Sequence, residues 1–175
     1  MDIRAGSDND RQACVELWCA ALKARDGQVD AAAVTARARD KFTHPIVRFA
    51  VVDETTAHGT GPVAFALTVD LGGRALGGRA FGDRALGDRA GSRAATFELL
   101  AVAPDESGRG LGRALLTDAI QSAADLGYAS IELLVRDGNS RAQGLYTAAG
   151  FEPFGEPEPH PLGGPPMVRY TRETA

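Results

Sequence analysis

The feature that most constrains the fold is a glycine-rich segment between a strand pattern and a helix pattern. Residues 96–102 (TFELLAV) read as a β-strand, and the segment 104–112 that follows contains Gly108, Gly110 and Gly112. Residues 130–135 (SIELLV) read as the next strand. A strand–helix–strand unit of this length makes its two strands parallel neighbours through a right-handed crossover.

The helix inside this unit has one apolar face. Apolar residues recur at spacings of three and four, polar residues occupy the opposite face, and Gly127 is a typical helix end. We therefore expect a buried face made of Leu111, Leu115, Leu116, Ala119, Ile120 and Ala123.

The remaining patterns surround this unit with further strands and helices. Turn residues at 58–61 separate two apolar runs, which predicts a hairpin and an antiparallel start to the sheet. The expected fold is α/β, with a mixed, mostly antiparallel sheet flanked by helices. The further strands are expected at 3–5, 46–52, 62–71 and 167–171, and the further helices from the 7–10 region to about 25, at 30–42 and at 139–150.

Length and composition predict one globular domain over residues 1–175, because the chain has 175 residues of which 44% are hydrophobic. No apolar run approaches the roughly 20 residues of a membrane-spanning helix. The N-terminal residues lack an apolar run behind a basic cluster, so we expect a cytoplasmic location and no membrane partner. The formal net charge of −4 argues against nucleic acid as the main partner.

The cysteines and histidines show no pattern of metal ligation or nucleophilic catalysis. Cys14 and Cys19 are five residues apart on one expected helix and would point in different directions, which favours packing over a disulfide. His44, His58 and His160 lie in turn-like sequence without metal-ligand spacing, so we expect surface residues and no bound metal.

Residues 71–90 consist of four copies of a five-residue repeat, LGGRA, LGGRA, FGDRA and LGDRA. A step of five keeps the large residues off a common face in both helix and strand, so we interpret 72–93 as a Gly/Arg-rich insertion between neighbouring strands. Five arginines and two aspartates give residues 71–94 a charge of +3. A solvent-exposed loop, a substrate lid, an oligomer contact and a nucleic-acid arm all remain possible.

The glycine-rich segment has the chemistry of a phosphate-binding loop. A strand that ends in such a loop before a helix directs backbone N–H groups and the positive end of a helix dipole at one spot. A Cβ at Gly108, Gly110 or Gly112 would block close approach or forbid the backbone angles. Arg109 and Arg113 could add charge-assisted contacts. Neither a Walker motif nor a dinucleotide fingerprint is present.

Three segments together resemble the GCN5-related N-acetyltransferase (GNAT) family. They are Val102-Ala103-Pro104, the run from Gly108 to Leu116, and the run from Asn139 to Phe151. The resemblance covers nearly the whole chain in element order. It implies the GNAT fold, whose sheet splays into a V between two central parallel strands, here 96–102 and 129–135. Ser107 departs from the family pattern, which has Gln or Arg there.

The resemblance also implies acetyl-CoA as the cofactor. The loop 107–113 would hold the pyrophosphate, the pantetheine arm would pair with backbone at 100–102, and Asn139 would contact the cofactor arm. The implied cofactor-binding residues are Leu100, Ala101, Val102, Ser107, Gly108, Arg109, Gly110, Leu111, Gly112, Arg113 and Asn139.

Acetyl transfer to an amine needs a proton acceptor for the amine and a proton donor for the departing thiolate. Tyr146 matches the family position of the donor, although it would also suit a core aromatic. The glutamate that some members carry on the fifth strand is replaced by Leu134. Glu98, acting through a water, or Glu132 could be the base, and a solvated glutamate is the competing interpretation.

These residues predict an acetyl-CoA-dependent N-acetyltransferase that acetylates a primary amine of a small molecule or peptide by direct attack in a ternary complex. The alternatives are a noncatalytic acyl-CoA sensor and a nucleic-acid-associated protein that uses the arginine repeat. The first two helices and residues 153–167 would form the acceptor wall, and a homodimer is possible. Four acids suggest a cationic acceptor: Asp26, Asp30, Glu156 and Glu158.

Overall fold

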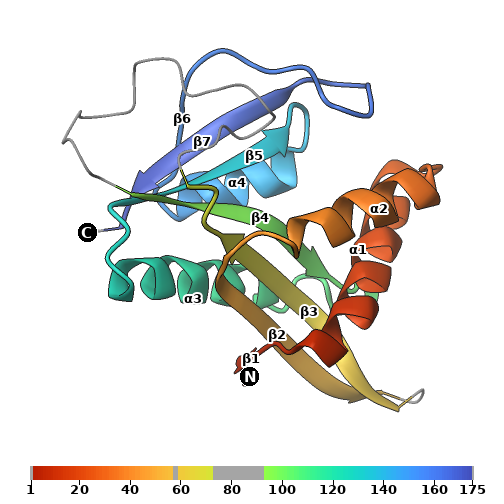
Figure 1. Ribbon diagram of the computed structural model, residues 1–175. Helices are drawn as coiled ribbons and strands as arrows, with labels where there is room; N and C mark the ends of the chain where they lie inside the picture. The colour runs from red at the N-terminus through yellow and green to blue at the C-terminus, as the bar shows by residue number, and fades with distance from the viewer. Residues whose placement is uncertain (1, 57–58, 73–92, 175) are drawn as a thin grey trace.

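The computed structural model describes residues 2–56, 59–72 and 93–174. Its centre is a seven-stranded sheet in the order β1-β2-β3-β4-β5-β7-β6 (Figure 1). Strands β4 and β5 are parallel, and the other neighbouring pairs are antiparallel. The predicted mixed, mostly antiparallel sheet is therefore confirmed.

The elements follow the expected order along the chain. The helices are α1 (Arg11–Asp26), α2 (Ala31–Lys41), α3 (Leu111–Asp125) and α4 (Ser140–Ala148). The strands are β1 (Arg4–Ala5), β2 (Ile46–Thr56), β3 (Gly59–Val69), β4 (Ala94–Val102), β5 (Ser130–Arg136), β6 (Glu152–Pro153) and β7 (Met167–Glu173).

Helices cover both faces of the sheet and divide the core into two clusters (Figure 1). On one face α1 and α2 pack over β2, β3 and β4, with Cys14, Phe49, Phe65 and Leu99 among the buried residues. On the other face α3 and α4 pack over β2 to β5. Burial of this apolar surface is the main force that holds the layers together.

The strand–helix–strand unit forms as predicted. The buried residues of α3 are the six expected from their spacing: Leu111, Leu115, Leu116, Ala119, Ile120 and Ala123. Gly127, with φ +76°, ends the chain's helical path after α3 and returns it to β5.

The main differences from the expectations lie in the first hairpin and at the edge of the sheet. Strands β2 and β3 extend further into their hairpin than predicted, and the short strand β6 was not predicted. β6 contains Pro153 and pairs with β7 at the edge of the sheet, where a missing backbone N–H is tolerated. A strand of two residues is too short to show the alternation of apolar and polar residues from which a strand is predicted.

The Gly/Arg-rich segment connects two neighbouring strands, as expected, because β3 and β4 pair antiparallel. Its described ends are joined by Asp70 and Arg93, whose side chains are 2.5 Å apart. The Tyr128 hydroxyl donates to Asp70 at 2.9 Å, and the Arg93 guanidinium lies over the Tyr128 ring. The repeat spans residues 71–90, and all of it except Leu71 and Gly72 lies outside the described residues.

Both cysteines are free thiols, and the packing role predicted for them fits their places in α1. Cys14 is fully buried, and this burial raises the pKa of its thiol to about 12. His44 and His160 are half-buried rather than surface residues, and His58 lies outside the described residues. Among the described helices, none is long and apolar enough to cross a membrane.

Candidate functional site

The sheet opens between its two parallel strands. β4 and β5 pair from Ala94–Ser130 to Phe97–Leu133, and their pairing stops there. Beyond that point β4 continues along β3, and β5 continues along β7. The edge of β4 from Glu98 to Val102 thus faces an opening instead of a strand. This is the V-shaped splay that the family resemblance implies.

A β-bulge sits at the point where the strands separate. The β3–β4 register runs from Thr68–Phe97 to Leu67–Leu99, so Glu98 has no partner residue on β3. Phe97 faces the core under α3 and α4, whereas Leu99 faces the core under α1 and α2. Alternation predicts Glu98 opposite Leu99, and this is wrong because the bulge turns both toward α1 and α2.

Glu98 forms an ion pair with Lys41, the last residue of α2. Both side chains are mostly buried, at 10% and 16% exposure. Lys41 holds the carboxylate of Glu98 at the mouth of the splay. Sequence reasoning missed Lys41, since nothing in its local pattern points to a partner so distant along the chain.

The glycine-rich loop enters α3 with free backbone donors. Gly108 and Gly110 have φ +86° and +80°, and a Cβ built on either would meet no described atom within 4 Å. Gly110 is the N-cap of α3 and offers no side chain, and the first helical bond runs from Ala114 N–H to Gly110 C=O. The preceding N–H groups of 111–113 therefore point outward without a helical acceptor.

At Gly112 the loop lies against both β4 and α4. A Cβ on Gly112 would lie 3.7 Å from Leu145 of α4 and 3.8 Å from Leu100 of β4, which is ordinary contact. Its φ is not positive, so of the two reasons expected for a glycine here, the backbone angles do not apply and close approach of a ligand remains the prediction. The loop, the open edge of β4 and α4 converge at this residue.

The other predicted loop residues have defined surroundings. Arg109 is paired with Glu54, at 2.7 Å, and with Glu106, and these carboxylates raise the pKa of its guanidinium. Arg113 is exposed, and Ser107 donates its N–H to Pro104 C=O. The Leu111 side chain is 2% exposed and belongs to the core, so its backbone alone faces the loop.

The three β4 residues predicted to line the cofactor arm lie along the open edge. The side chain of Ala101 is buried under α1 and α2, and those of Leu100 and Val102 pack toward α3. Their side chains thus belong to the two cores. The backbone groups of this edge have no β5 partner beyond Phe97 and are available to the splay.

Tyr146 and Asn139 both belong to the α4 region. The Tyr146 ring packs edge-to-face on Phe97, with centroids 6.3 Å apart, and on Phe151. Burial raises the pKa of its hydroxyl, which stays protonated at neutral pH. Asn139 caps α4 through a 3.3 Å bond from Ala142 N–H. Tyr146 and Glu98 therefore flank β4 from opposite faces, where the sheet opens.

Glu132, the second candidate base, lies within the paired part of β5, before the splay. It is 8% exposed, and burial raises the pKa of its carboxyl although Arg169 opposes the shift. The ionised form is therefore less favourable in the folded chain than in the unfolded one. Because Glu132 lies away from the opening, its position favours Glu98 as the candidate base.

We expect Glu132→Gln to stabilise the protein at neutral pH. A carboxyl whose pKa is raised by folding lowers stability above its folded pKa, and this penalty disappears below the unfolded value of about 4.3. The melting temperature at pH 7.5 should rise by roughly 2–4 °C, and the gain should vanish near pH 4. Thermal unfolding followed by circular dichroism measures both, with the exposed Glu152→Gln as control. A lower melting temperature at pH 7.5 would contradict the assignment.

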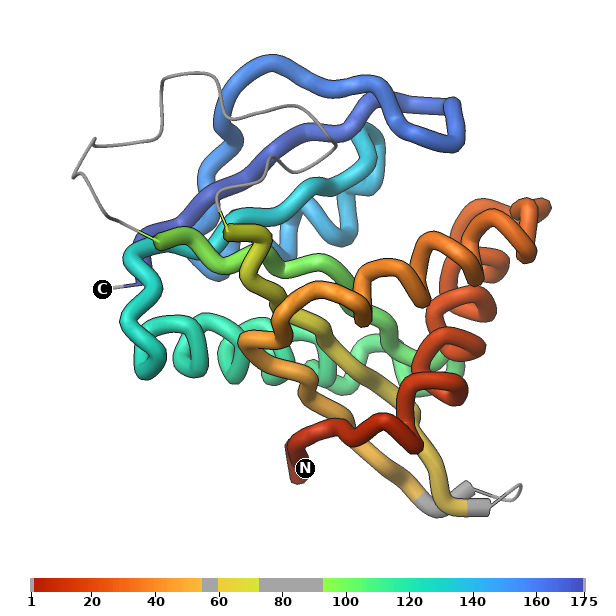
Figure 2. The backbone as a smooth tube through the Cα atoms, in the orientation of Figure 1, coloured from red at the N-terminus to blue at the C-terminus, as the bar shows by residue number. Residues whose placement is uncertain are grey.

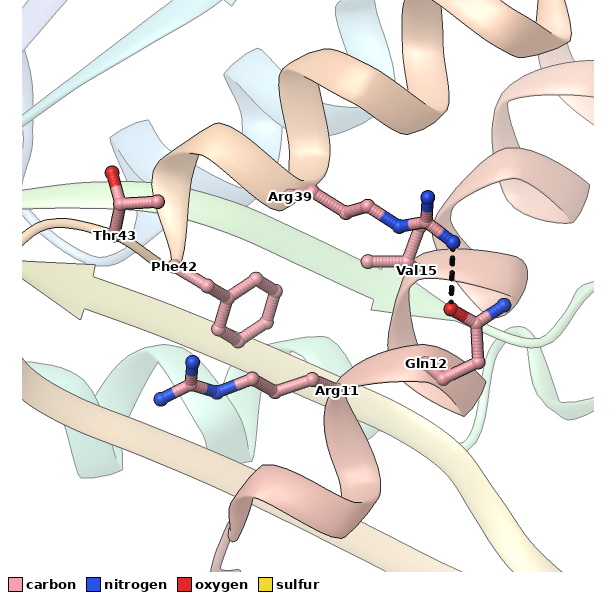
Figure 3. Close-up of a pocket in the computed structure, with 6 residues that line it drawn as sticks. All are labelled: Arg11, Gln12, Val15, Arg39, Phe42 and Thr43. Atoms are coloured by element: carbon pink, nitrogen blue, oxygen red, sulfur yellow. Dashed lines mark hydrogen bonds between the residues drawn. The ribbon is translucent and has the colours of Figure 1, made fainter.

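A separate pocket of about 240 Å³ lies between α1 and the end of α2 (Figure 3). It contains an Arg39–Gln12 hydrogen bond of 2.8 Å, and the Arg11 guanidinium lies over the Phe42 ring. None of the predicted site residues lines it, so it is distinct from the splay. The lining residues are Arg11, Gln12, Val15, Arg39, Phe42 and Thr43.

Comparison with known families agrees with this geometry. Residues 30–151 match the family model described as "Acetyltransferase (GNAT) family". The matched range contains the loop, the splay and α4.

Curated relatives match shorter parts of the chain. A mycothiol acetyltransferase of Beutenbergia cavernae is 45% identical over 62 residues, which are 34% of this chain and 21% of that protein. The enzyme of the same name from Pseudarthrobacter chlorophenolicus is 39% identical over 92 residues, 51% of this chain and 28% of that protein. The chain thus spans about a quarter of the length of these relatives.

Solved structures share the fold over the whole chain. The ribosomal-protein-S18-alanine N-acetyltransferase of Escherichia coli has a TM-score of 0.68 at 21% identity, covering 99% of this chain and 94% of that one. A Salmonella typhimurium protein described as an acetyltransferase, solved with its cofactor acetyl-CoA, has a TM-score of 0.63 at 20% identity. It covers 100% of this chain and 94% of that one.

Proposed function

The chain belongs to the GNAT acetyltransferase family, and from this premise we propose that it transfers the acetyl group of acetyl-CoA to a primary amine. The observation that carries the proposal is the end of β4–β5 pairing at Phe97–Leu133, directly beside a glycine loop with free N–H groups. The family match over residues 30–151 spans both features and supports the proposal.

The residues of the splay fit acetyl-CoA. Outward N–H groups at 111–113 and the positive end of α3 suit a pyrophosphate. The open edge of β4 offers unpaired backbone groups at 100–102 to the amide groups of the pantetheine arm. Asn139 keeps its amide nitrogen available while its oxygen caps α4. Arg109 can reach the phosphates only by leaving Glu54 and Glu106, so we assign the larger role to the backbone.

Bound acetyl-CoA supplies an activated thioester. We assign the amine proton to Glu98, directly or through one water, while the amine nitrogen forms its bond to the acetyl carbon. Tyr146 then donates its hydroxyl proton to the sulfur as the carbon–sulfur bond breaks. Lys41 pairs with Glu98 and orients its carboxylate, and burial keeps Tyr146 protonated. The products are the acetamide and free CoA.

The test is transfer itself. The purified protein is incubated with acetyl-CoA and a panel of amino acids, amino sugars and peptides, and free thiol and acetylated products are measured by thiol reagent and mass spectrometry. We expect at least one amine to be acetylated with one CoA released per product. Acetyl-CoA binding without transfer to any amine would contradict the enzymatic function.

One observation favours a second candidate, a noncatalytic acyl-CoA sensor. The fifth strand has Leu134 where some family members carry a glutamate, and Glu98 is already paired with Lys41. A sensor would bind acetyl-CoA with the same loop and release no CoA. The amine panel therefore separates the two functions.

A further inference from the structure

Three segments meet at the end of β5, on the side of the splay where the α1–α2 connection and the β6–β7 connection lie (Figures 1 and 2). Arg136, the last residue of β5, lies three positions beyond the last β4–β5 pair. Its Nη1 atom is 3.1 Å from Oδ2 of Asp26, at the end of α1. Its Nη2 atom is 3.5 Å from Nε2 of His160, in the β6–β7 connection.

Positive charge exceeds negative charge at this meeting point. Arg25 binds Asp26 through two contacts of 2.6 Å, so this one carboxylate serves both Arg25 and Arg136. Burial lowers the pKa of His160, and the charges of Arg136, Arg37 and Arg25 lower it further, outweighing a backbone hydrogen bond at Gly163. Two guanidinium groups, those of Arg25 and Arg136, thus share one carboxylate, and the charge of Arg37 also acts on the imidazole.

The guanidinium of Arg136 has one closer and one longer contact. Its Nη1 atom is 3.1 Å from the Asp26 carboxylate, whereas its Nη2 atom is 3.5 Å from Nε2 of His160, whose Nδ1 accepts the Leu162 N–H at 3.1 Å. An anionic oxygen is a stronger acceptor for a guanidinium than a ring nitrogen. The Nη2 side of Arg136 therefore suits an anion.

The acids that suggest a cationic acceptor in the sequence are engaged elsewhere. Asp30 accepts from Ala33 N–H at 3.0 Å and caps α2. Glu158 is paired with Arg169, and Asp26 serves Arg25 and Arg136. Glu156 alone among the four acids is exposed without a role in these contacts. Three of the four acids are therefore not free to bind a cationic acceptor, and at the end of β5 two guanidinium groups share the one carboxylate of Asp26.

We propose that Arg25, Arg37, Arg136 and His160 bind an anionic group, a carboxylate or a phosphate, carried by the amine that the enzyme acetylates. This inference rests on the proposed acetyl transfer and names its acceptor class. Guanidinium groups suit such anions because their planar donors match two oxygens at once. Burial raises the pKa of Tyr146 and the charge of Arg25 opposes that rise, so the cluster and the proposed proton donor interact electrostatically.

The first test compares amines that differ only in the anionic group. The pairs are β-alanine with β-alaninamide and O-phosphoethanolamine with ethanolamine, at equal concentrations of free amine. For at least one pair, kcat/KM should be at least about tenfold higher for the anionic member, and high salt should reduce the difference.

Variants of the cluster test whether these residues cause the preference. Arg136→Gln and Arg37→Gln should abolish it. Arg39→Gln should retain it, because Arg39 is on the same helix as Arg37 but is bonded to Gln12. Equal rates within both pairs, or a preference that survives in Arg136→Gln and Arg37→Gln, would overturn the proposal.

A binding measurement decides the case in which no amine is acetylated. N-acetyl-β-alanine and its carboxamide are titrated into the protein and its variants, and affinities are measured by ligand-observed NMR. Tighter binding of the carboxylate that is lost in Arg136→Gln supports the anion site even if acetyl transfer fails. Equal binding of the two compounds overturns the anion site. Circular dichroism confirms that each variant is folded.

Discussion

Replacing Tyr146 with phenylalanine will lower kcat for amine acetylation by about 10²-fold or more, the typical contribution of a positioned proton donor. The substitution keeps the ring that packs on Phe97 and Phe151 and removes only the hydroxyl. Because burial raises the pKa of this hydroxyl, it holds its proton at neutral pH and can give it to the leaving sulfur. The dissociation constant of acetyl-CoA should stay within about twofold, since the proton is transferred only as the thioester breaks.

Steady-state kinetics and a calorimetric titration of acetyl-CoA measure the two quantities separately. Tyr128→Phe is the matched control, because the Tyr128 hydroxyl bonds Asp70 at the base of the Gly/Arg-rich segment. That control should leave kcat within about twofold of the parent, as expected for a group outside the transition state. Unchanged turnover in Tyr146→Phe would remove Tyr146 as the proton donor.

Replacing Gly110 with valine will weaken acetyl-CoA binding by about 100-fold or more, because φ +80° is strained for a β-branched residue and its side chain would enter the phosphate site. A Cβ there meets no described protein atom within 4 Å, so the space it takes is the space the loop leaves open. The backbone N–H groups of 111–113 would lose close access to the pyrophosphate. Isothermal titration calorimetry measures the change.

Gly127→Val controls for the backbone strain. Gly127 has φ +76° and equally open surroundings, but it lies at the opposite end of α3. Both variants should lose stability, and only Gly110→Val should lose affinity. Equal losses of affinity in the two variants would show that strain in α3, rather than the loop, explains the effect.

The sequence contains most of the fold because its patterns are local. The spacing of apolar residues in α3 gives the buried face residue by residue, and Gly127 gives its end. The strand–helix–strand pattern over residues 96–135 predicts one parallel strand pair, and the turn residues between two apolar runs predict the antiparallel start of the sheet. The glycine loop was found through the same short-range pattern.

The residues around the opening were harder to predict, because they depend on contacts between distant segments. The bulge at Glu98 changes which face of β4 each residue takes, and its cause is the pairing with β3 rather than any local signal. The partners of Glu98 and Arg109 are 57 and 55 positions away in the chain. Periodicity carries no information on such pairs.

The charge around the acceptor amine was equally hard to predict from the sequence. Counting acids in the two helices and in 153–167 suggests negative charge, yet the fold pairs Asp26 with Arg136, which lies 110 positions further along. The sign of a local field depends on which charges the fold brings together. Composition therefore could not predict the acceptor.

The most direct test of the central claim, that acetyl-CoA binds in the splay, is amide hydrogen–deuterium exchange of the protein with and without acetyl-CoA, followed by mass spectrometry. We expect slower exchange in peptides covering 98–103 and 107–113, where open backbone groups would gain acceptors or lose contact with water. Unchanged exchange in both segments, or protection confined to the pocket around Arg11 and Phe42, would contradict it.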